Sequence, residues 1–344
     1  MTRPHLLVLN ERDIDNPLAG GAEVHFIEIF SRLAARGFRV TLICAGFPGA
    51  DERTTQRGVE IVRVGNRYTF YVRGPALYRR LERAITGPAL LIEDLNKLPF
   101  CGPLYARLPI LAIVHHLFGT TAFRQANLPV ATVTYLSELG IPAMYRRVPM
   151  VAVSPSTRDD LIARGIARDR ITMIPNGLDH ARYSPAGTPP ARMILSLGRV
   201  EPYKRVDIAI SAMAKVVKAV PDARFLIVGR GEALAGLELQ VARLGLTGVV
   251  QFRGFVSEEE KVDLYRGARV FVNPSEKEGW GLTILEANAC GVPSVASDVP
   301  GLRDSVRHEE TGILVRHGDV DACAAALQRV LTDDATWSRL RTGA

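Results

Sequence analysis

Residues 193–228 read MILSLGRVEPYKRVDIAISAMAKVVKAVPDARFLIV. Met193–Leu197 and Arg224–Val228 are short, nearly continuous apolar runs of strand length. Between them, Val206–Val220 carries apolar residues at helical spacing. A strand, a helix and a second strand in this order form the repeating unit of a parallel sheet that is covered by helices. The stretch therefore predicts an α/β fold.

The same alternation runs through both halves of the 344-residue chain. Further strands are expected at residues 5–9, 39–44, 59–64, 90–92, 110–115, 150–154, 249–252, 270–272 and 294–296, and further helices at 24–36 and 234–244. A single hydrophobic core stops growing at about 250–300 residues, so a chain of this length favours two domains. We expect two doubly wound Rossmann-like domains, residues 1–185 and 186–344, joined near the Pro- and Gly-rich stretch Ser184–Ala191 and facing a central cleft.

The composition excludes several classes of protein. An apolar fraction of 47% with 23% charged residues is typical of a globular chain and argues against a disordered or fibrous one. The four cysteines are scattered without a CxxC pair, which excludes a zinc ribbon or a disulfide scaffold and indicates a reducing compartment. The most apolar stretch, Leu108–Gly119, is too short to span a bilayer, and the N-terminus lacks a secretory leader pattern. We expect a cytoplasmic protein.

The positive charge lies in the first half of the sequence. Residues 1–185 hold 23 Lys and Arg against 16 Asp and Glu, whereas the remainder holds 20 of each. Such a half either contacts phosphates, acidic lipid headgroups or nucleic acid, or is simply a solvated arginine-rich surface. A helix predicted at Pro75–Ala84, with Arg79, Arg80 and Arg83 opposite its apolar side, could lie on the inner face of an anionic membrane or dock on its own domain. No nucleic-acid-binding signature is present, so no nucleic-acid partner is expected.

Two loops between a strand and a helix are candidate anion sites. In Gly20–Glu23 (GGAE), glycines allow close approach of the backbone, and the N-terminus of the next helix offers free N–H groups. This is not the GxGxxG dinucleotide fingerprint, and a plain tight turn is the alternative. In Leu197–Arg205, the cations Arg199 and Lys204 suit a diphosphate, the alternative being solvated basic residues before a helix.

The segment Glu278–Glu286 (EGWGLTILE) places two carboxylates around an irregular loop. Gly279–Gly281 predicts that loop, and Leu282–Ala289 predicts a helix, so that Glu278 precedes the helix and Glu286 lies about one turn inside it. The two carboxylates can face one cavity and accept hydrogen bonds from separate hydroxyl groups of a long polar ligand.

Two adjacent histidines follow the strand predicted at residues 110–115. His115 is expected to face the cleft, where a near-neutral pKa suits hydrogen bonding or proton transfer, and His116 to face the other side. A purely structural histidine is the alternative.

Other common site motifs are absent or badly placed. Asp13-Ile14-Asp15 and Asp319-Val320-Asp321 match the DxD handle for divalent cations, but neither follows a strand directly, and we expect no essential metal and no cofactor. The sequence also lacks the phosphate-binding loop of NTPases and the Gly-x-Ser-x-Gly elbow of α/β-hydrolases.

Taken together, these motifs resemble those of the retaining glycosyltransferases of family 4, which have the GT-B fold. The resemblance covers nearly the whole chain and includes Ile174–Asp179 (IPNGLD) before the domain crossover. It implies transfer of a sugar from a UDP- or GDP-sugar to a hydroxyl of a glycan, lipid-linked or small-molecule acceptor, with the anomeric configuration retained and without a metal. The first domain would then serve the acceptor side and the second would bind the donor.

The resemblance also implies a role for each matching residue. Gly20 and Gly21 would meet the donor diphosphate, which Arg199 and Lys204 would neutralise as it leaves. His115 and Glu278 would contact the transferred sugar, and Glu286 the ribose. Phe252–Val256 resembles the base-contacting loop, with Phe255 at the base. The remaining donor-binding residues would be Gly279, Trp280, Gly281, Leu282 and Thr283.

The sequence departs from the family pattern at its C-terminal end. Family members commonly continue into a helix that returns to the first domain, and we expect that helix to be missing from a chain that stops at Ala344. Two rival functions remain open on these grounds. One is a nucleotide-sugar epimerase or hydrolase on the same fold, and the other is a non-catalytic protein that binds sugar nucleotides.

Overall fold

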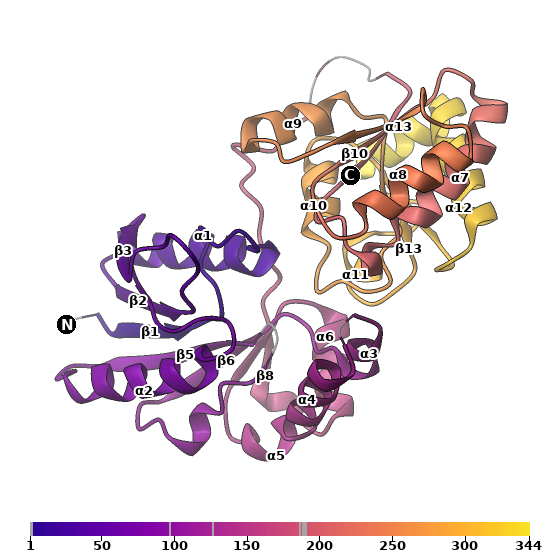
Figure 1. Ribbon diagram of the computed structural model, residues 1–344. Coiled ribbons are helices and arrows are strands. Elements are labelled where there is room, and N and C mark those ends of the chain that lie inside the picture. The colour runs from indigo at the N-terminus through magenta and orange to yellow at the C-terminus, as the bar shows by residue number, and fades with distance from the viewer. Residues whose placement is uncertain (1–2, 96–97, 126, 186, 188–190) are drawn as a thin grey trace. The chain divides into compact units, whose positions relative to one another are not determined.

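The computed structural model describes residues 3–95, 98–125, 127–185, 187 and 191–344 (Figure 1). The chain divides into two compact units, one ending at Asn176 and the other starting at Gly177. This division precedes the predicted boundary at 185/186, because the residues after Asn176 pack with the second unit and Tyr183 is buried in its core. Part of the predicted linker Ser184–Ala191 lies outside the described residues.

The first unit is built on an eight-stranded sheet in the order β3-β4-β2-β1-β5-β6-β7-β8. Its strands are β1 (His5–Leu9), β2 (Arg39–Cys44), β3 (Arg53–Gln56), β4 (Val59–Arg63), β5 (Ala89–Leu95), β6 (Ile110–Val114), β7 (Met150–Ala152) and β8 (Ile171–Met173). Neighbouring strands are parallel except the β3–β4 hairpin.

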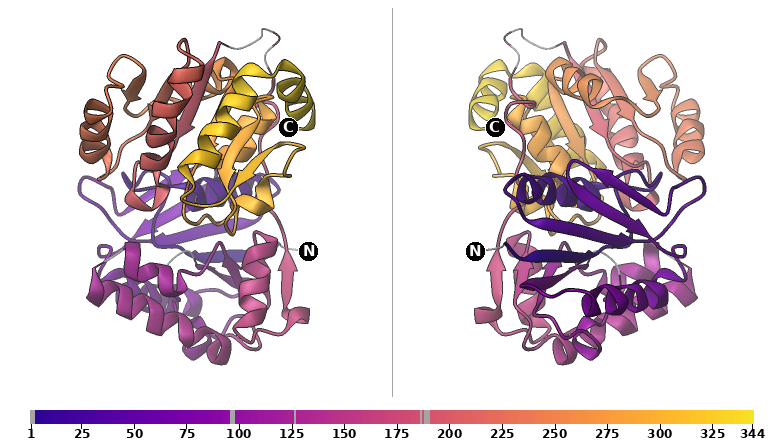
Figure 2. Two further views of the ribbon diagram at one scale, coloured as in Figure 1. Left: turned by 90° about the vertical axis from the view of Figure 1, so that its right-hand side faces the viewer. Right: turned by 90° about the vertical axis from the view of Figure 1, so that its left-hand side faces the viewer.

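Helices cover both faces of this sheet (Figures 1 and 2). They are α1 (Gly21–Ala35), α2 (Phe70–Arg83), α3 (Ala122–Gln125), α4 (Leu128–Leu139), α5 (Ile141–Met144) and α6 (Pro155–Ala163). A core of buried aromatic and aliphatic side chains, among them Phe70, Tyr78 and Tyr145, packs α2 and the α5 region against the sheet. The central strands are apolar on both faces, as expected of a parallel sheet buried on both sides.

The second unit repeats this plan with six parallel strands in the order β11-β10-β9-β12-β13-β14. The strands are β9 (Met193–Leu197), β10 (Arg224–Val228), β11 (Val250–Arg253), β12 (Val270–Asn273), β13 (Ser294–Ser297) and β14 (Gly312–Val315). The helices are α7 (Val206–Ala219), α8 (Leu234–Arg243), α9 (Glu258–Gly267), α10 (Leu282–Ala289), α11 (Leu302–Ser305), α12 (Val320–Thr332) and α13 (Asp334–Gly343). One core packs α7, α8 and α12 on one face, and another packs α9, α10 and α11 on the other.

Both sheets contain a topological switch point. In the first unit the chain builds outward from β1 to β2 and β4, and then restarts on the other side of β1 with β5. In the second unit it builds from β9 to β11, and restarts on the other side of β9 with β12. Loops that leave the carboxyl ends of the two strands at a switch point diverge, so a ligand can enter between them. The predicted doubly wound α/β architecture is thus confirmed in each unit.

Helix α2 differs from its prediction. It begins at Phe70 rather than after Gly74, and Pro75 lies inside it. The start is set by Asn66, whose side chain accepts hydrogen bonds from the backbone N–H groups of Tyr68 and Thr69. This is a local turn that an Asn side chain stabilises. No helix within the described ranges is long and apolar enough to cross a membrane.

Candidate active site

Lys204 and Glu278 meet at the switch point of the second unit. Lys204 ends a single 3-10 turn after β9, Glu278 lies in the loop after β12, and Lys204 Nζ is 2.5 Å from Glu278 Oε1. The two side chains are only 20% and 15% exposed. Burial by itself lowers the pKa of Lys204, but the charge and hydrogen bond of Glu278 outweigh it, and the pKa is raised above its ordinary value. Lys204 is therefore a fixed cation at neutral pH.

Glu278 is held in place by a residue of its own loop and by the loop after β13. Ser275 Oγ lies 2.8 Å from Glu278 Oε1, to which it can donate its proton. The backbone N–H of Glu278 donates to the carbonyl of Pro300 at 3.3 Å. Gly301 follows with φ +84°, and a Cβ at that position would lie 2.1 Å from the carbonyl oxygen of Glu278. Only glycine allows this close approach of the loop after β13.

Arg199 provides a second cation beside Lys204. Its guanidinium donates to the hydroxyl of Tyr203 at 2.9 Å, and Lys204 Nζ lies 5.2 Å from the centre of the Tyr203 ring. Both cations line a small, open pocket at the carboxyl ends of β9, β10 and β12. Arg205, although adjacent in sequence, is paired with Asp207 at the start of α7. Two cations against one carboxylate leave this pocket with a net positive charge, which suits an anionic ligand.

The predicted helix Leu282–Ala289 is confirmed as α10. It starts after Gly281, which has φ +67°, and a Cβ there would lie 2.8 Å from Ser305 Oγ. Gly279 and Trp280 form the turn before it, and Leu282 and Thr283 are its first, half-buried residues.

Glu286 lies on α10 in surroundings different from those of Glu278. Its carboxylate accepts hydrogen bonds from Tyr265 at 2.8 Å, Tyr183 at 3.2 Å and Lys261 at 3.1 Å, and its side chain is almost buried. Burial and the charge of Glu286 raise the pKa of Tyr265, which keeps that hydroxyl a donor. The expectation that Glu278 and Glu286 face one cavity stays a prediction.

Phe255 projects from the loop between β11 and α9. Its side chain is 80% exposed, a large exposure for an aromatic ring. Ser257 starts α9 just beyond it, its side chain accepting a hydrogen bond from Glu260 N. An exposed ring at the carboxyl end of a strand offers a flat surface on which a base can stack.

The glycine loop of the first unit is closed by Glu23. Gly20 precedes α1, and its backbone N–H donates to Glu23 Oε2 at 2.6 Å. Gly21 is the first residue of α1 and is exposed. The N–H of Gly20 is thus used within the loop, and the exposed start of α1 lies at Gly21.

His115 follows β6 directly and is buried, 6% exposed. Its Nε2 atom lies 2.8 Å from Oδ1 of Asp94, a fully buried residue near the end of β5. The two atoms are close but are not aligned for a linear hydrogen bond. Burial by itself lowers the pKa of His115, but the charge of Asp94, with a further contribution from Glu23, outweighs it and raises that pKa above its ordinary value.

Two more polar side chains complete this cluster at the switch point of the first unit. The ring of His25, on α1, stands edge-on to the ring of His115 with centroids 5.1 Å apart. Asn10, directly after β1, donates to Asp94 Oδ2 at 3.4 Å. Sequence reasoning missed Asp94, Asn10 and His25. The available signal was the acidic pair Glu93-Asp94 at the end of an apolar strand.

The DxD matches have structural partners. Asp13 accepts two hydrogen bonds from Arg63, at 2.8 and 3.1 Å, and Asp15 accepts one from the same guanidinium. Asp319 caps α12 by accepting from Ala322 N at 2.8 Å. In the part of the chain that the structure describes, no group of three or more His, Cys, Asp or Glu residues is placed to hold a metal ion.

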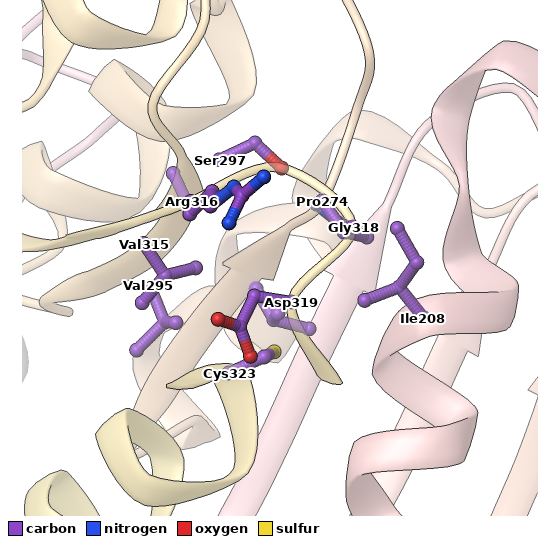
Figure 3. Close-up of a pocket in the computed structure, with 11 residues that line it drawn as sticks. Ile208, Pro274, Val295, Ser297, Val315, Arg316, Gly318, Asp319 and Cys323 are labelled. Atoms are coloured by element: carbon purple, nitrogen blue, oxygen red, sulfur yellow. The ribbon is translucent and has the colours of Figure 1, made fainter. Parts of the chain in front are cut away.

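A second small, open pocket adjoins the one at Lys204 (Figure 3). Val272 and Pro274 line both. Figure 3 shows Val295, Val315 and Ile208 around it, with Asp319 and Arg316 as charged neighbours. None of the predicted site residues lines this pocket, so the Lys204 pocket is the better candidate for the ligand.

A glycosyltransferase family model matches each half of the chain. A family model described as Glycosyltransferase Family 4 matches residues 19–182, and one described as Glycosyl transferases group 1 matches residues 185–344. A D-inositol 3-phosphate glycosyltransferase of Thermomonospora curvata is 27% identical over 95% of this chain and 86% of its own length. The enzyme of the same name from Streptomyces bingchenggensis is 31% identical over 69% of this chain, but the match spans only 57% of that relative.

Solved structures share the fold. A sucrose-phosphate synthase from Thermosynechococcus elongatus has a TM-score of 0.83 at 23% identity, covering 99% of this chain and 93% of that one. HepE of Anabaena, in complex with UDP and glucose, has a TM-score of 0.78 at 20% identity, covering 99% and 93%. These likenesses confirm the GT-B fold class. With the two models together spanning nearly all of it, the chain belongs to the family 4 glycosyltransferases.

Proposed function

We propose that this chain transfers a sugar from a nucleoside-diphosphate donor, a UDP- or GDP-sugar, to an acceptor hydroxyl with retention of configuration and without a metal. The observation that carries the proposal is the buried Lys204–Glu278 pair with Arg199 at the switch point of the second unit. The names of the two inositol-phosphate relatives favour glycosyl transfer, and the UDP and glucose bound by HepE favour a nucleoside-diphosphate donor.

The charges suit the reaction. When the bond between the anomeric carbon and the diphosphate oxygen breaks, the electron pair stays on the diphosphate and the sugar ring becomes positive. Arg199 and Lys204 would stabilise the leaving diphosphate, and Glu278 would accept hydrogen bonds from the sugar hydroxyls beside the positive ring. The acceptor oxygen bonds to the same carbon, and its proton passes to the leaving diphosphate oxygen. Fixed charges of this kind stabilise the transition state more than the ground state.

Further residues would hold the rest of the donor. In this proposal Glu286 binds the ribose and Phe255 stacks on the base, while Gly279–Thr283 forms the wall between them. Gly21 would offer its N–H to the diphosphate from the first unit, and His115 would hydrogen-bond the transferred sugar. Two cations beside the diphosphate supply the charge that a divalent metal would otherwise bring, so we expect activity to persist in EDTA.

The decisive experiment compares nucleotide release with and without acceptor. The full chain is incubated with UDP- and GDP-sugars and with glycan, lipid-linked and small-molecule acceptors, and the product anomer is assigned by NMR. Release that requires the acceptor, with the donor's anomeric configuration kept in the product, supports a retaining transferase. Release without acceptor indicates a hydrolase, interconversion of the donor sugar an epimerase, and tight binding without turnover a binding protein.

Lys204→Ala tests the leaving-group role directly. Loss of one preorganised charge at a leaving group is expected to lower kcat by about 10²–10³-fold. Lys215→Ala is the matched control, because Lys215 is an exposed lysine of the same unit whose ion pair is with Asp321 on α12. A Lys204→Ala rate close to that of the control contradicts the role, provided that both variants unfold at the wild-type temperature.

We also propose that the acceptor is anionic or lies at the surface of an anionic membrane, because the positive charge of the chain is concentrated in residues 1–185. The apolar side of the helix predicted at Pro75–Ala84, now part of α2, packs on its own domain, because Tyr78 is buried in the core. Exposed apolar side chains lie instead on α4, where Leu128, Val133 and Leu136 are more than half exposed. Co-sedimentation with vesicles containing phosphatidylglycerol should exceed that with phosphatidylcholine alone, and Leu136→Glu should reduce it. Equal recovery with both vesicles contradicts the membrane alternative and leaves an anionic acceptor in solution, which the acceptor assay above tests.

A further inference from the structure

The polar cluster at the switch point of the first unit contains a residue, Asp94, that can act on the transfer reaction through His115. We propose that Asp94 is a positioning residue, which holds the His115 imidazole protonated and oriented so that its Nδ1–H donates a hydrogen bond to the transferred sugar. The inference rests on the proposed function, because it deepens the role of His115 within it.

The placement of the two side chains follows from the sheet. Adjacent parallel strands β5 and β6 pair Leu95 with Val114, so that Asp94 and His115 come within reach at their carboxyl ends. Asp94 is 0% exposed and His115 6%, and 2.8 Å separates Oδ1 from Nε2. A buried carboxylate away from water needs a charged or hydrogen-bonded partner. Asn10 contacts its other oxygen, but an amide carries no charge, so His115 is the group that balances Asp94.

The neighbours of His115 allow one positive charge in this cluster. The titratable groups that face it are Asp94 on β5, and Glu23 and His25 on α1. Burial first, and then the charge of His115, lower the pKa of His25 to about 4, so His25 stays neutral. Glu23 adds negative charge while it accepts from the Gly20 N–H. Both carboxylates therefore favour the proton on His115, and the second histidine does not compete for it.

A charged His115 paired with Asp94 suits glycosyl transfer in two ways. Both ring nitrogens of an imidazolium are donors, so Nδ1 can donate to a hydroxyl while Nε2 faces the carboxylate. The pair as a whole is neutral, and it therefore does not repel the positive charge that forms on the sugar ring. An unpaired imidazolium in the same place would do so. Asp94 thus acts through His115 rather than on the substrate.

The test is the pH profile of kcat for Asp94→Asn. In the wild type the imidazolium, with its Nδ1–H, is present below the raised pKa of His115. This hydrogen-bond donor is lost as pH increases through that pKa. Removing the carboxylate charge takes away an effect typically worth about 1–3 pKa units, so the alkaline limb of the profile should move to lower pH by roughly 1–3 units. The KM for the donor should change less than kcat, because the substitution leaves the other proposed donor contacts, among them Arg199, Lys204 and Glu286, unchanged.

Glu93→Gln is the matched control. Glu93 precedes Asp94 on the same strand, is equally buried, and bonds to Tyr145 on the other face of the sheet. It should leave the alkaline limb in place. If Asp94→Asn does not fold, His115→Gln offers the same check, since a glutamine donor does not titrate and should abolish the limb. An NMR titration of His115 in the wild type, giving a pKa above 6.5, is expected as well.

The outcomes separate this inference from the proposed function. Release of nucleotide without acceptor overturns the proposed transferase, and normal turnover by Lys204→Ala overturns the leaving-group role of Lys204. A slow Lys204→Ala enzyme together with an unmoved alkaline limb in Asp94→Asn, or a limb that survives in His115→Gln, overturns the positioning role alone. A His115 pKa below 6.5 in the wild type does so without any assay of turnover.

Discussion

A single glycine fixes the backbone of the catalytic candidate Glu278. Gly301 combines φ +84° with a position at which a Cβ would lie 2.1 Å from the Glu278 carbonyl oxygen. The loop after β13 is therefore pressed against the loop after β12, and the Glu278 N–H completes the contact at Pro300 O. The orientation of the carboxylate depends on a residue 23 positions later in the chain.

Gly301→Ala should damage both stability and turnover. A positive φ costs a non-glycine residue about 1–3 kcal/mol, and the clash with Glu278 should add about 1–3 kcal/mol more. Gly318→Ala is a close control, because Gly318 has φ +82° with no atom within 4 Å of the added Cβ. Urea unfolding should show the larger loss for Gly301→Ala, and only that variant should lose kcat. Equal losses in the two variants would remove the close approach as an explanation.

At the scale of an element, β5 ends in two buried acids that face opposite sides of the sheet. Asp94 meets His115, whereas Glu93 accepts a hydrogen bond from Tyr145 and lies against Gly102. Burial raises the pKa of Glu93 to about 7, although the hydrogen bonds from Tyr145 and from the Gly102 backbone oppose the shift. The alternation of side chains along a strand thus gives two neighbouring buried carboxyls different partners.

Glu93 should make the stability of the chain depend on pH. Its pKa is higher folded than unfolded, where it is near 4.5, so between about pH 4.5 and 7 the native state binds the extra proton. The free energy of unfolding should therefore fall as pH increases through this window, by roughly 3 kcal/mol for this group. Glu93→Gln should flatten that decline in urea titrations from pH 5 to 8. Glu52→Gln, at an exposed position, should leave the decline unchanged. If Glu93→Gln shows a decline as large as the wild type, the pH dependence comes from other groups.

The bounds of a strand could be predicted where burial on both faces makes the strand a continuous apolar run in the sequence. Buried strands such as β1, β9 and β10 have the predicted bounds, because a strand covered on both faces is a continuous apolar run. The edge strands β3 and β8 were missed, since β3 is polar (RTTQ) and β8 has only three residues. They exist because a neighbouring strand offers backbone partners, which local sequence does not report.

At the scale of the whole molecule, the predicted donor contacts of the second unit come from three separate loops. The loop after β9 spans residues 198–205, the loop after β11 spans residues 254–257, and the loop after β12 spans residues 274–281 and continues into α10. Glu286 connects α10 to α9 through Tyr265 and Lys261. A nucleotide that touches these loops should therefore restrain segments far apart in sequence.

Hydrogen exchange of the full chain with and without UDP or GDP checks this placement. Protection is expected in the three loops and at the start of α10, and the nucleotide that binds should also stabilise the chain by about 2.7 kcal/mol at 100 times its Kd. Glu286→Ala should weaken both effects. Protection confined to the pocket of Figure 3 would move the nucleotide site to the ends of β13 and β14.

The sequence by itself determined the fold class, the repeated α/β plan and the identity of the loops that carry Arg199, Lys204, Glu278 and His115. Apolar periodicity and turn residues are local, and they are enough to say which loops leave the carboxyl ends of strands. Tertiary structure alone decided the partners: Lys204 with Glu278, 74 residues away, Asp94 with His115, and Glu286 with two tyrosines. The order of strands in a sheet sets which loops meet, and strand order depends on packing between distant segments rather than on any local pattern.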